Sequence, residues 1–518
     1  MAEKGGKAGV HEGEEILLPG LDYSSSVQFE NGSLAGNIRK TSKISRSPSI
    51  EIEIEKLQGN RITLFHTCCI LVTMIGSSGI FIVPATLVHY CGSVGITLIV
   101  MVITGFVNYS LSKCFAEVAI ILPKAGGPYF FIMQVFGRFP AFFFMWGMLF
   151  LIVCPVWALL SYTAALYIIQ PIFPGCNSPV AAIKLLAICI LVLVVVINCL
   201  YMKYVSKVQA ALSSSKLVAV SVIIIGGIIK ACQGETENFR DIFENSNISA
   251  GEFALSGMAG MYFFGGWQMI TFLMEEMDKP LKTLPRALNL SFSVVILMYV
   301  LIMAAYFVVL SPAELVQSDA VALRFMERLY VPFSPVMSIL VTATSVGALN
   351  ACVLGHSRFL AAVASQGHLP HLLSTISVTY SMPWPAIIVL SLLSIMYLVT
   401  GTVELLIQCV SVYACIMAVS VLTCLLVLKR NHPPAPDSIR VSRALAVSQL
   451  ILASAILLMS VYEKPGPMGT IMAILASGIL AYLFGVLWKP KPTALDRCID
   501  NSTVFLQKLF VLKSPLSE

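Results

Sequence analysis

Two short glycine-containing interruptions lie inside long apolar stretches of the sequence. The first, Gly76-Ser77-Ser78-Gly79, lies in the middle of residues 62–89, and the second, Gly265-Gly266, lies near the middle of residues 252–274. Glycine weakens a helix and serine competes for backbone hydrogen bonds, so each helix is predicted to break there. N–H groups freed at a helix start bind a carboxylate, and carbonyls freed at a helix end accept from an ammonium. Together the two interruptions would make a site for a zwitterionic α-amino acid.

The same residues also have a purely structural interpretation, because Gly and Ser are common where membrane helices pack closely. The placement of the two interruptions favours binding. They lie five apolar stretches apart, as inverted five-helix repeats require. Corresponding interruptions in two halves of a chain are the best sequence indication of the midplane site of a secondary transporter.

A lysine, Lys216, follows three serines inside the apolar stretch 208–231. An ammonium inside a membrane span is energetically expensive and usually functional. The alternative is a lysine whose side chain extends to the membrane interface, since Lys216 lies only about two helical turns beyond Lys207.

Other chemistry is poorly represented inside the apolar stretches, which contain no Asp-rich, His-rich or nucleophile–base cluster. A multi-span enzyme acting on lipid or isoprenoid would need such residues to bind a metal or move protons. An ion channel would need a repeated filter loop or rings of charge. The sequence therefore favours a transporter over both classes, with no metal and no cofactor.

The composition places these residues in a membrane. The chain has 518 residues, of which 57% are hydrophobic and 12% are charged, whereas soluble proteins carry about 25% charged residues. The mean hydropathy is +0.86. This composition excludes a soluble enzyme, a nucleic-acid binder and a disordered scaffold. In a membrane protein, the net charge of +6 reflects the orientation of the loops and does not indicate an acidic ligand.

At roughly 20 apolar residues per helix, the chain has material for about a dozen spans, so we expect an all-α polytopic membrane protein with twelve transmembrane helices. The apolar stretches are 62–89, 94–116, 139–168, 181–200, 208–231, 252–274, 287–310, 334–357, 384–400, 402–428, 443–461 and 466–488.

The loops between these stretches sort by charge. With twelve crossings, most Lys and Arg residues fall on the side of the N-terminus, so both termini are predicted to be cytoplasmic. Residues 1–60 are polar and show no signal peptide, which predicts a disordered cytoplasmic tail, and residues 489–518 form a second tail. The loop 232–251 on the other side carries a glycosylation sequon at Asn247, whose occupancy stays open.

Several further motifs occur in a fixed order over about residues 60–490. They are Ser77-Ser78-Gly79-Ile80-Phe81, Ala116-Glu117, Lys124-Ala125-Gly126-Gly127-Pro128-Tyr129, Glu275-Glu276 with Pro280 and Pro285, and Ser357-Arg358 with Gly367-His368-Leu369-Pro370. On this ordered set the chain resembles the L-type light subunits of the heteromeric amino acid transporters, in the amino acid–polyamine–organocation superfamily. One such match is weak, whereas the whole set is specific.

This resemblance implies a LeuT-like fold with rocking-bundle exchange. The domain 61–488 would hold a first five-helix repeat at about 62–231, a second at about 252–428, and two C-terminal helices at about 443–488. The resemblance also implies sodium independence, because members that lack a sodium ion can place a lysine where the ion would lie, and Lys216 matches that lysine. Substrate would contact Ser77, Ser78, Gly79 and Ile80 in the first interruption, and Gly265 with the gating aromatic Tyr262 in the second.

Light subunits of this family lie in the plasma membrane and are disulfide-linked to a single-span glycoprotein heavy chain of the rBAT or 4F2 type. The linking cysteine lies between helices three and four, where Cys176 is the only cysteine of its loop. A cysteine in an outside loop with no partner in that loop also indicates an intermolecular bond. An internal bridge to Cys91 or Cys232 is the alternative.

Departures from the family pattern bear on the substrate. Ser77 replaces the usual glycine, and its β-carbon would narrow access to the backbone. Cys154 precedes Pro155 where relatives often carry a basic residue, and the tenth stretch has no basic residue until Lys429. Cystine/glutamate exchangers of the family use such cations, so their absence argues against an anionic substrate.

The middles of the first, sixth and tenth stretches also lack acidic residues, which leaves a neutral pocket. Large neutral or aromatic L-amino acids are the preferred substrates on this interpretation. A small-neutral or a cystine/glutamate-like exchanger is the alternative, and the aromatic residues could instead serve packing. The residues that could line the pocket are Tyr262, Phe263, Phe264, Trp267 and Tyr413.

Overall fold

The computed structural model describes most of the chain from residue 63 onward. The described residues are 63–488 without 77–78, 123–125, 174–177, 201, 248, 278, 379, 381 and 432–439, together with 503–505, 507–508 and 511–513. The predicted tail 1–60, and the candidate residues Ser77, Ser78 and Cys176, lie outside this part.

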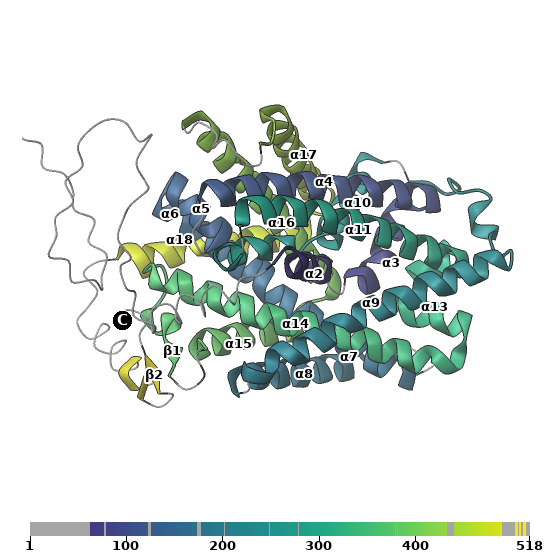
Figure 1. The fold of residues 1–518 in the computed structure, drawn as a ribbon, viewed down its shortest axis with the longest axis horizontal. Coiled ribbons are helices and arrows are strands. Elements are labelled where there is room, and N and C mark those ends of the chain that lie inside the picture. The colour runs from purple at the N-terminus through teal and green to yellow at the C-terminus, as the bar shows by residue number, and fades with distance from the viewer. Residues whose placement is uncertain are drawn as a thin grey trace, which may run out of the picture. The chain divides into compact units, whose positions relative to one another are not determined.

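The described chain is almost wholly helical (Figure 1). The α-helices are α2 (Leu64–Met74), α3 (Gly79–Cys91), α4 (Val94–Ile121), α5 (Gly127–Phe136), α6 (Arg138–Gly147), α7 (Cys154–Ile169), α8 (Val180–Leu200), α9 (Met202–Cys232), α10 (Ala250–Phe263), α11 (Pro280–Val309), α12 (Pro312–Val316), α13 (Val321–Leu329), α14 (Ser334–Ser365), α15 (Trp384–Thr400), α16 (Val403–Asn431), α17 (Arg443–Glu463) and α18 (Pro465–Tyr482).

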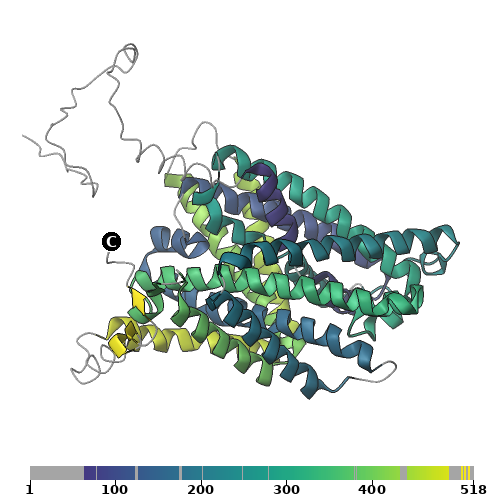
Figure 2. The same cartoon turned by 60° about the horizontal axis from the view of Figure 1, so that its bottom comes forward.

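Short elements complete the described chain. Two π-helical segments are η1 (Met148–Val153) and η7 (Leu483–Leu487). The 3₁₀ segments are η2 (Gln170–Ile172), η3 (Glu237–Phe239), η4 (Trp267–Glu276), η5 (Val331–Phe333) and η6 (His371–Ser374). The strand β1 (Ile376–Ser377), in the loop between α14 and α15, pairs antiparallel with β2 (Leu512–Lys513) near the C-terminus. Figure 2 shows this yellow C-terminal segment at one end of the bundle.

Each of the twelve predicted stretches coincides with helical structure. Within the described residues, nine helical segments are long and apolar enough to cross a membrane, and α2 with α3, bent by 47°, would make a tenth. The other two predicted spans fall on α10 with η4, which is interrupted, and on α15, which has only 17 residues. An all-helical polytopic membrane protein is confirmed, and the count of twelve stays a prediction.

Packing separates central from peripheral helices. α7 packs against α8 and α14, while α9 packs against α14 and α11, and α11 lies along α4 (Figure 1). Only 17% of the residues in the most apolar part of α17 are buried within the bundle, and the share is the same for α18 with η7. Their remaining apolar surface therefore suits contact with lipid.

The two glycine-containing stretches interrupt their helices, as the sequence predicts. α2 ends at Met74, and Gly76 follows with a φ of +64°. α10 ends at Phe263, and Gly266 follows with a φ of +97°. Only glycine adopts such positive φ angles without a steric penalty, so these residues permit the chain to turn out of each helix. Figure 1 shows α2 and α3 as separate helices near the middle of the bundle.

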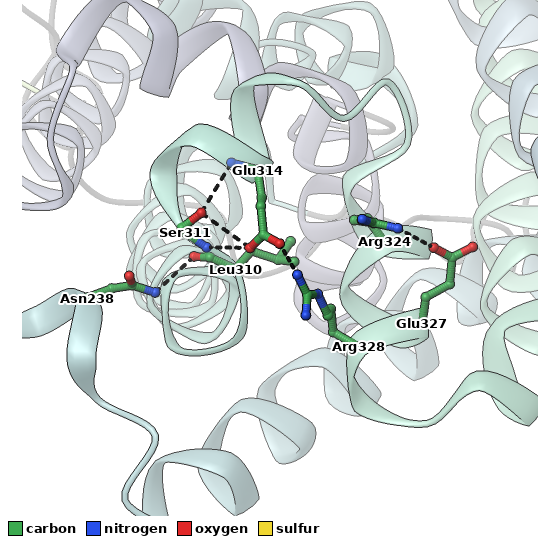
Figure 3. Close-up of polar contacts among 7 residues, drawn as sticks. All are labelled: Asn238, Leu310, Ser311, Glu314, Arg324, Glu327 and Arg328. Atoms are coloured by element: carbon green, nitrogen blue, oxygen red, sulfur yellow. Dashed lines mark hydrogen bonds and ion pairs between the residues drawn. The ribbon is translucent and has the colours of Figure 1, made fainter. Parts of the chain in front are cut away.

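Short helices follow the second and the seventh predicted span. α5 begins after Gly126 with Pro128 in its first turn, and α12 with α13 follow α11. Ser311 and Glu314 form a reciprocal capping box at the start of α12, and Arg328 of α13 forms an ion pair with Glu314 (Figure 3). The Ser311 backbone N–H, and then Arg328, lower the pKa of the Glu314 carboxyl. These contacts fix α12 against α13.

Candidate functional site

The two interrupted helices meet at their breaks. The backbone N–H of Gly76 donates to the carbonyl of Gly265 at 2.8 Å. A β-carbon on Gly76 would lie 2.3 Å from the Phe263 carbonyl oxygen, and one on Gly266 would lie 2.3 Å from the Met74 carbonyl oxygen. Both distances are far below van der Waals contact, so the two backbones touch only because both positions are glycine.

Lys216 on α9 reaches the end of α2. Its ammonium donates to the carbonyls of Val72 at 3.2 Å, Thr73 at 3.3 Å and Ile75 at 2.8 Å. The Tyr299 hydroxyl of α11 lies 3.3 Å from the ammonium and itself donates to the Ile75 carbonyl at 2.6 Å. Lys216 is only 1% exposed, so its side chain does not extend to the membrane interface. The ammonium lies where a helix end carries partial negative charge.

A cavity adjoins the two breaks, and its wall comes from predicted spans one, three, six, eight and ten together with α5. Its lining residues are Met74, Gly76, Pro128, Met148, Ile152, Val156, Met261, Tyr262, Gly265, Gly266, Gln268, Met269, Ala348, Cys352, His356, Val410, Ala414 and Met417. None of these lining residues is Asp, Glu, Lys or Arg.

The wall of the cavity is rich in sulfur. Five methionines and a cysteine line it, beside three polar side chains, those of Tyr262, Gln268 and His356. Methionine is unbranched and polarizable, so it adapts to side chains of different shapes and makes favourable contacts with aromatic rings. Within the described part of the chain, no group of three or more His, Cys, Asp or Glu is placed to hold a metal ion.

The predicted aromatic residues separate into two groups. Tyr262 lines the cavity, and its ring lies 3.5 Å from the place of a β-carbon on Gly79. Phe263 and Phe264 are both 0% exposed, and their rings lie 4.9 Å and 5.4 Å from that of Tyr299. Their side chains are not among those that line this cavity, and both rings pack against Tyr299.

Three further candidates are also packed away from the cavity. The Tyr413 hydroxyl donates to the Phe144 carbonyl, and its ring is buried. Trp267 donates from its indole nitrogen to Asn108 at 3.3 Å, and Ile80 is fully buried. Of the predicted site residues that the structure describes, Tyr262 and Gly265 line the cavity, while Gly79 lies beside the Tyr262 ring.

Most of the lining residues were not predicted from the sequence, and two groups of them are informative. Met148 and Ile152 belong to the π-helical segment η1, and such segments occur frequently at functional sites. The Tyr397 hydroxyl donates to the Phe150 carbonyl of this segment at 2.7 Å. No sequence signal marks a π-helical turn. The second group, on α14, includes His356, and a histidine inside an apolar stretch was a usable signal.

Comparisons with a family model and with individual proteins agree on one family. The model of the amino acid permease family matches residues 62–496. The large neutral amino acids transporter small subunit 2 of Mus musculus is 33% identical over 459 residues, covering 88% of this chain and 86% of the relative. The Asc-type amino acid transporter 1 of Homo sapiens is 32% identical over 463 residues, with coverage of 88% and 87%. The human cystine/glutamate transporter is 32% identical over 466 residues, with coverage of 89% and 92%.

These relatives are transporters and include a protein named as a small subunit. The resemblance to the light subunits is confirmed. At the level of the family, the comparisons also support the prediction of a transporter over that of a membrane enzyme. The match spans the paired breaks, Lys216 and every lining residue of the cavity. The chain belongs to the amino acid permease family.

Proposed function

We propose that this chain is a sodium-independent exchanger of neutral L-amino acids that binds its substrate at the paired breaks. The observation that carries this proposal is the hydrogen bond between Gly76 and Gly265, beside a cavity whose lining has no charged side chain. Two interrupted helices that meet at such a cavity offer backbone groups of both polarities in one place.

The two ends of a zwitterion would find complementary partners there. The N-terminus of α3, at Gly79 and Ile80, presents the positive end of a helix dipole, and together with Ser77 and Ser78 it is proposed to hold the carboxylate. The C-terminus of α10 offers carbonyls and the negative end of its dipole to the ammonium. These roles rest on backbone groups, so they do not require the side chains of Phe263 and Phe264 to face the cavity.

Lys216 is proposed to replace a sodium ion. A bound cation would need oxygen ligands, and the Lys216 ammonium already takes three carbonyls at the end of α2. An ammonium at this place would take the position of the cation and make transport independent of sodium. We therefore expect the same exchange rate in sodium and in choline buffers.

The side-chain pocket is proposed to select against charge. Burying an unpaired charged group costs several kcal/mol after relaxation, which corresponds to a preference of roughly 10²-fold or more for a neutral side chain. The methionines of the wall favour large and varied neutral side chains. Glutamate, cystine and lysine would therefore be poor substrates, although one relative is named for cystine and glutamate.

The architecture fits alternating access by two inverted repeats, at about 62–231 and 252–428. α5 follows the second span of the first repeat, as α12 and α13 follow the second span of the other. The breaks lie in the first span of each repeat. The proposal includes a plasma-membrane location, cytoplasmic termini and a heavy-chain partner of the rBAT or 4F2 type linked through Cys176.

Uptake by the full-length chain in proteoliposomes tests the proposal. Labelled tyrosine would enter only when amino acid is present inside, and a panel of aromatic, branched, small, cationic and acidic amino acids would compete in the order of their pocket fit. Uptake into empty vesicles at the same rate would exclude obligatory exchange. Competition by glutamate equal to that by phenylalanine would contradict the neutral pocket. Stronger competition by alanine and serine would indicate the small-neutral alternative.

A further inference from the structure

His356 is a buried histidine in the cavity wall. It lies on α14 with Ala348 and Cys352, and the four-residue spacing puts all three on one face of the helix. The residue is only 1% exposed. Its imidazole therefore faces the cavity in a setting with almost no access to bulk water.

Trp157 on α7 determines which nitrogen of His356 carries the proton. The indole Nε1 of Trp157 donates to His356 Nδ1 at 3.0 Å, and Trp157 is fully buried. Because an indole N–H can only donate, Nδ1 is the nitrogen without a proton, and the neutral ring carries its proton on Nε2. A second proton on Nδ1 would face the indole N–H and break this bond, so the geometry favours the neutral ring.

The proton-bearing Nε2 has no hydrogen-bond partner within the described part of the chain. A buried donor without an acceptor is unfavourable, and the penalty disappears when an acceptor arrives. Gln268, another polar residue of the wall, already accepts from the Gly266 N–H through its Oε1 at 2.9 Å. The structure thus holds an uncommitted neutral donor at the cavity.

We propose that His356 donates this hydrogen bond to an uncharged oxygen in the substrate side chain, either an amide carbonyl or a hydroxyl. This inference rests on the proposed function and narrows its substrate class to neutral amino acids with a polar side chain. A carboxylate would also accept the bond, but no cationic side chain lines the cavity to balance its charge. An apolar side chain of the same shape leaves Nε2 unpaired.

Substrate pairs that differ mainly in one oxygen-bearing group measure this contact. Asparagine and leucine are close in shape, and tyrosine and phenylalanine differ by one hydroxyl. The readout is the ratio of kcat/KM within each pair, in proteoliposomes that contain the full chain. In His356→Leu the preference for the polar member should fall by about tenfold in at least one pair. In His356→Gln it should persist, because the amide can accept from Trp157 and still donate.

Removal of His356 alone leaves the Trp157 N–H unpaired and can impair folding, so a double variant, Trp157→Phe with His356→Leu, removes both partners. It should show the same loss of preference. Cys352→Ala is the matched control, since it alters the same helix face and should change both members of a pair alike. A change in the ratio below about twofold in the folded leucine variants, single or double, would overturn the inference. Absence of exchange of every amino acid by the wild-type chain would instead overturn the proposed function.

Discussion

Two separately unfavourable features meet at Lys216. One is its own buried ammonium, and the other is the interrupted end of α2. The end of α2 leaves carbonyls without intrahelical partners, and the Lys216 ammonium and the Tyr299 hydroxyl take them up. The carbonyls give the buried ammonium its acceptors, and the ammonium gives these carbonyls a donor. Removal of the lysine would therefore expose several unpaired carbonyls, in a place next to the break at Gly76.

We predict that Lys216→Ala abolishes exchange while the protein still reaches the membrane. The physical reason is the loss of the cation that holds the end of α2. Lys230→Ala on the same helix is the control, because Lys230 forms only a surface ion pair with Glu235, and such pairs contribute about 0–1 kcal/mol. Exchange and surface expression of both variants would be measured side by side. Full activity of Lys216→Ala would refute the ion-replacing role.

Adjacent aromatic residues are predicted to respond differently to truncation. Phe263→Ala should lower the free energy of unfolding by about 3–5 kcal/mol, since it opens a cavity against Tyr299. Its substrate preference should stay as in the wild type. Tyr262→Ala should cost less stability and change the order of substrates, because Tyr262 lines the cavity.

Thermal unfolding in detergent and competition against labelled tyrosine measure the two properties. Wider acceptance of large side chains by Phe263→Ala, with little loss of stability, would place this ring in the binding pocket after all.

These aromatic residues show where sequence reasoning stops. The glycines predict the two breaks, because their conformational freedom is a local property. The sequence also predicts the lysine that serves one break. The direction in which Phe263, Phe264 and Tyr413 point depends on packing against α6 and α11, which no local pattern encodes. The hydrogen bond of His356 to Trp157 joins residues 199 positions apart, beyond any helical spacing.

At the scale of elements, the two breaks and the π-helical segment η1 interrupt helices next to the cavity. The freed groups have partners: Gly76 bonds to Gly265, and Tyr397 donates to the Phe150 carbonyl of η1. Inside a membrane such irregular backbone is tolerated where protein or a cavity surrounds it. The interruptions therefore concentrate polar backbone groups at one level of the bundle.

Substitution of the first break tests this arrangement. Gly76→Ala should abolish exchange, because its β-carbon would lie 2.3 Å from both the Phe263 carbonyl oxygen and the Tyr299 hydroxyl, at a φ of +64°. The cost of such strain is of order 1–3 kcal/mol before any clash is counted. Gly469→Ala in α18 is the control, since nothing lies within 4 Å of its β-carbon position. Exchange rate and thermal unfolding would be measured for both, and wild-type exchange by Gly76→Ala would contradict contact between the breaks.

Another element contact joins the motif residue Glu117 to a distant part of the chain. Its carboxylate pairs with Lys429 of α16 at 2.9 Å and accepts from the Val441 N–H at 3.1 Å. Both side chains are largely buried, at 5% and 13% exposure. The pair thereby ties α4 to the end of α16 and to the residues before α17. A buried pair of this kind is strongly destabilising to break, because removing one partner leaves the other charge uncompensated.

At the scale of the whole molecule, the composition predicted more of the fold than any single motif did. Low charge and long apolar stretches predict a polytopic helical bundle, and the structure places helices at all twelve stretches. The short helices α5, α12 and α13 were not predicted, because they have only 10, 5 and 9 residues and a search for membrane-spanning stretches of roughly 20 residues does not detect elements of this length. The pairing of β1 with β2 joins Ile376 to Lys513, 137 positions further along the chain, and could not be predicted from either strand alone.

The assembly with a heavy chain is the last prediction, and it concerns a residue outside the described part of the structure. Cys176 is the only cysteine of the loop between α7 and α8. Of the two rival cysteines, Cys91 is buried at the end of α3, whereas Cys232 is exposed at the end of α9, so Cys232 is the accessible one of the pair.

We expect the complex, expressed with a heavy chain of the rBAT or 4F2 type, to run as one high-mass band on a non-reducing gel. Cys176→Ser should release the free light chain, because the covalent bond is lost. Cys232→Ser is the matched control and should leave the band intact. Contacts between membrane helices do not depend on the disulfide. The Cys176→Ser pair should therefore still co-purify in mild detergent, with surface delivery only partly reduced. A high-mass band that survives Cys176→Ser and disappears in Cys232→Ser would assign the link to α9.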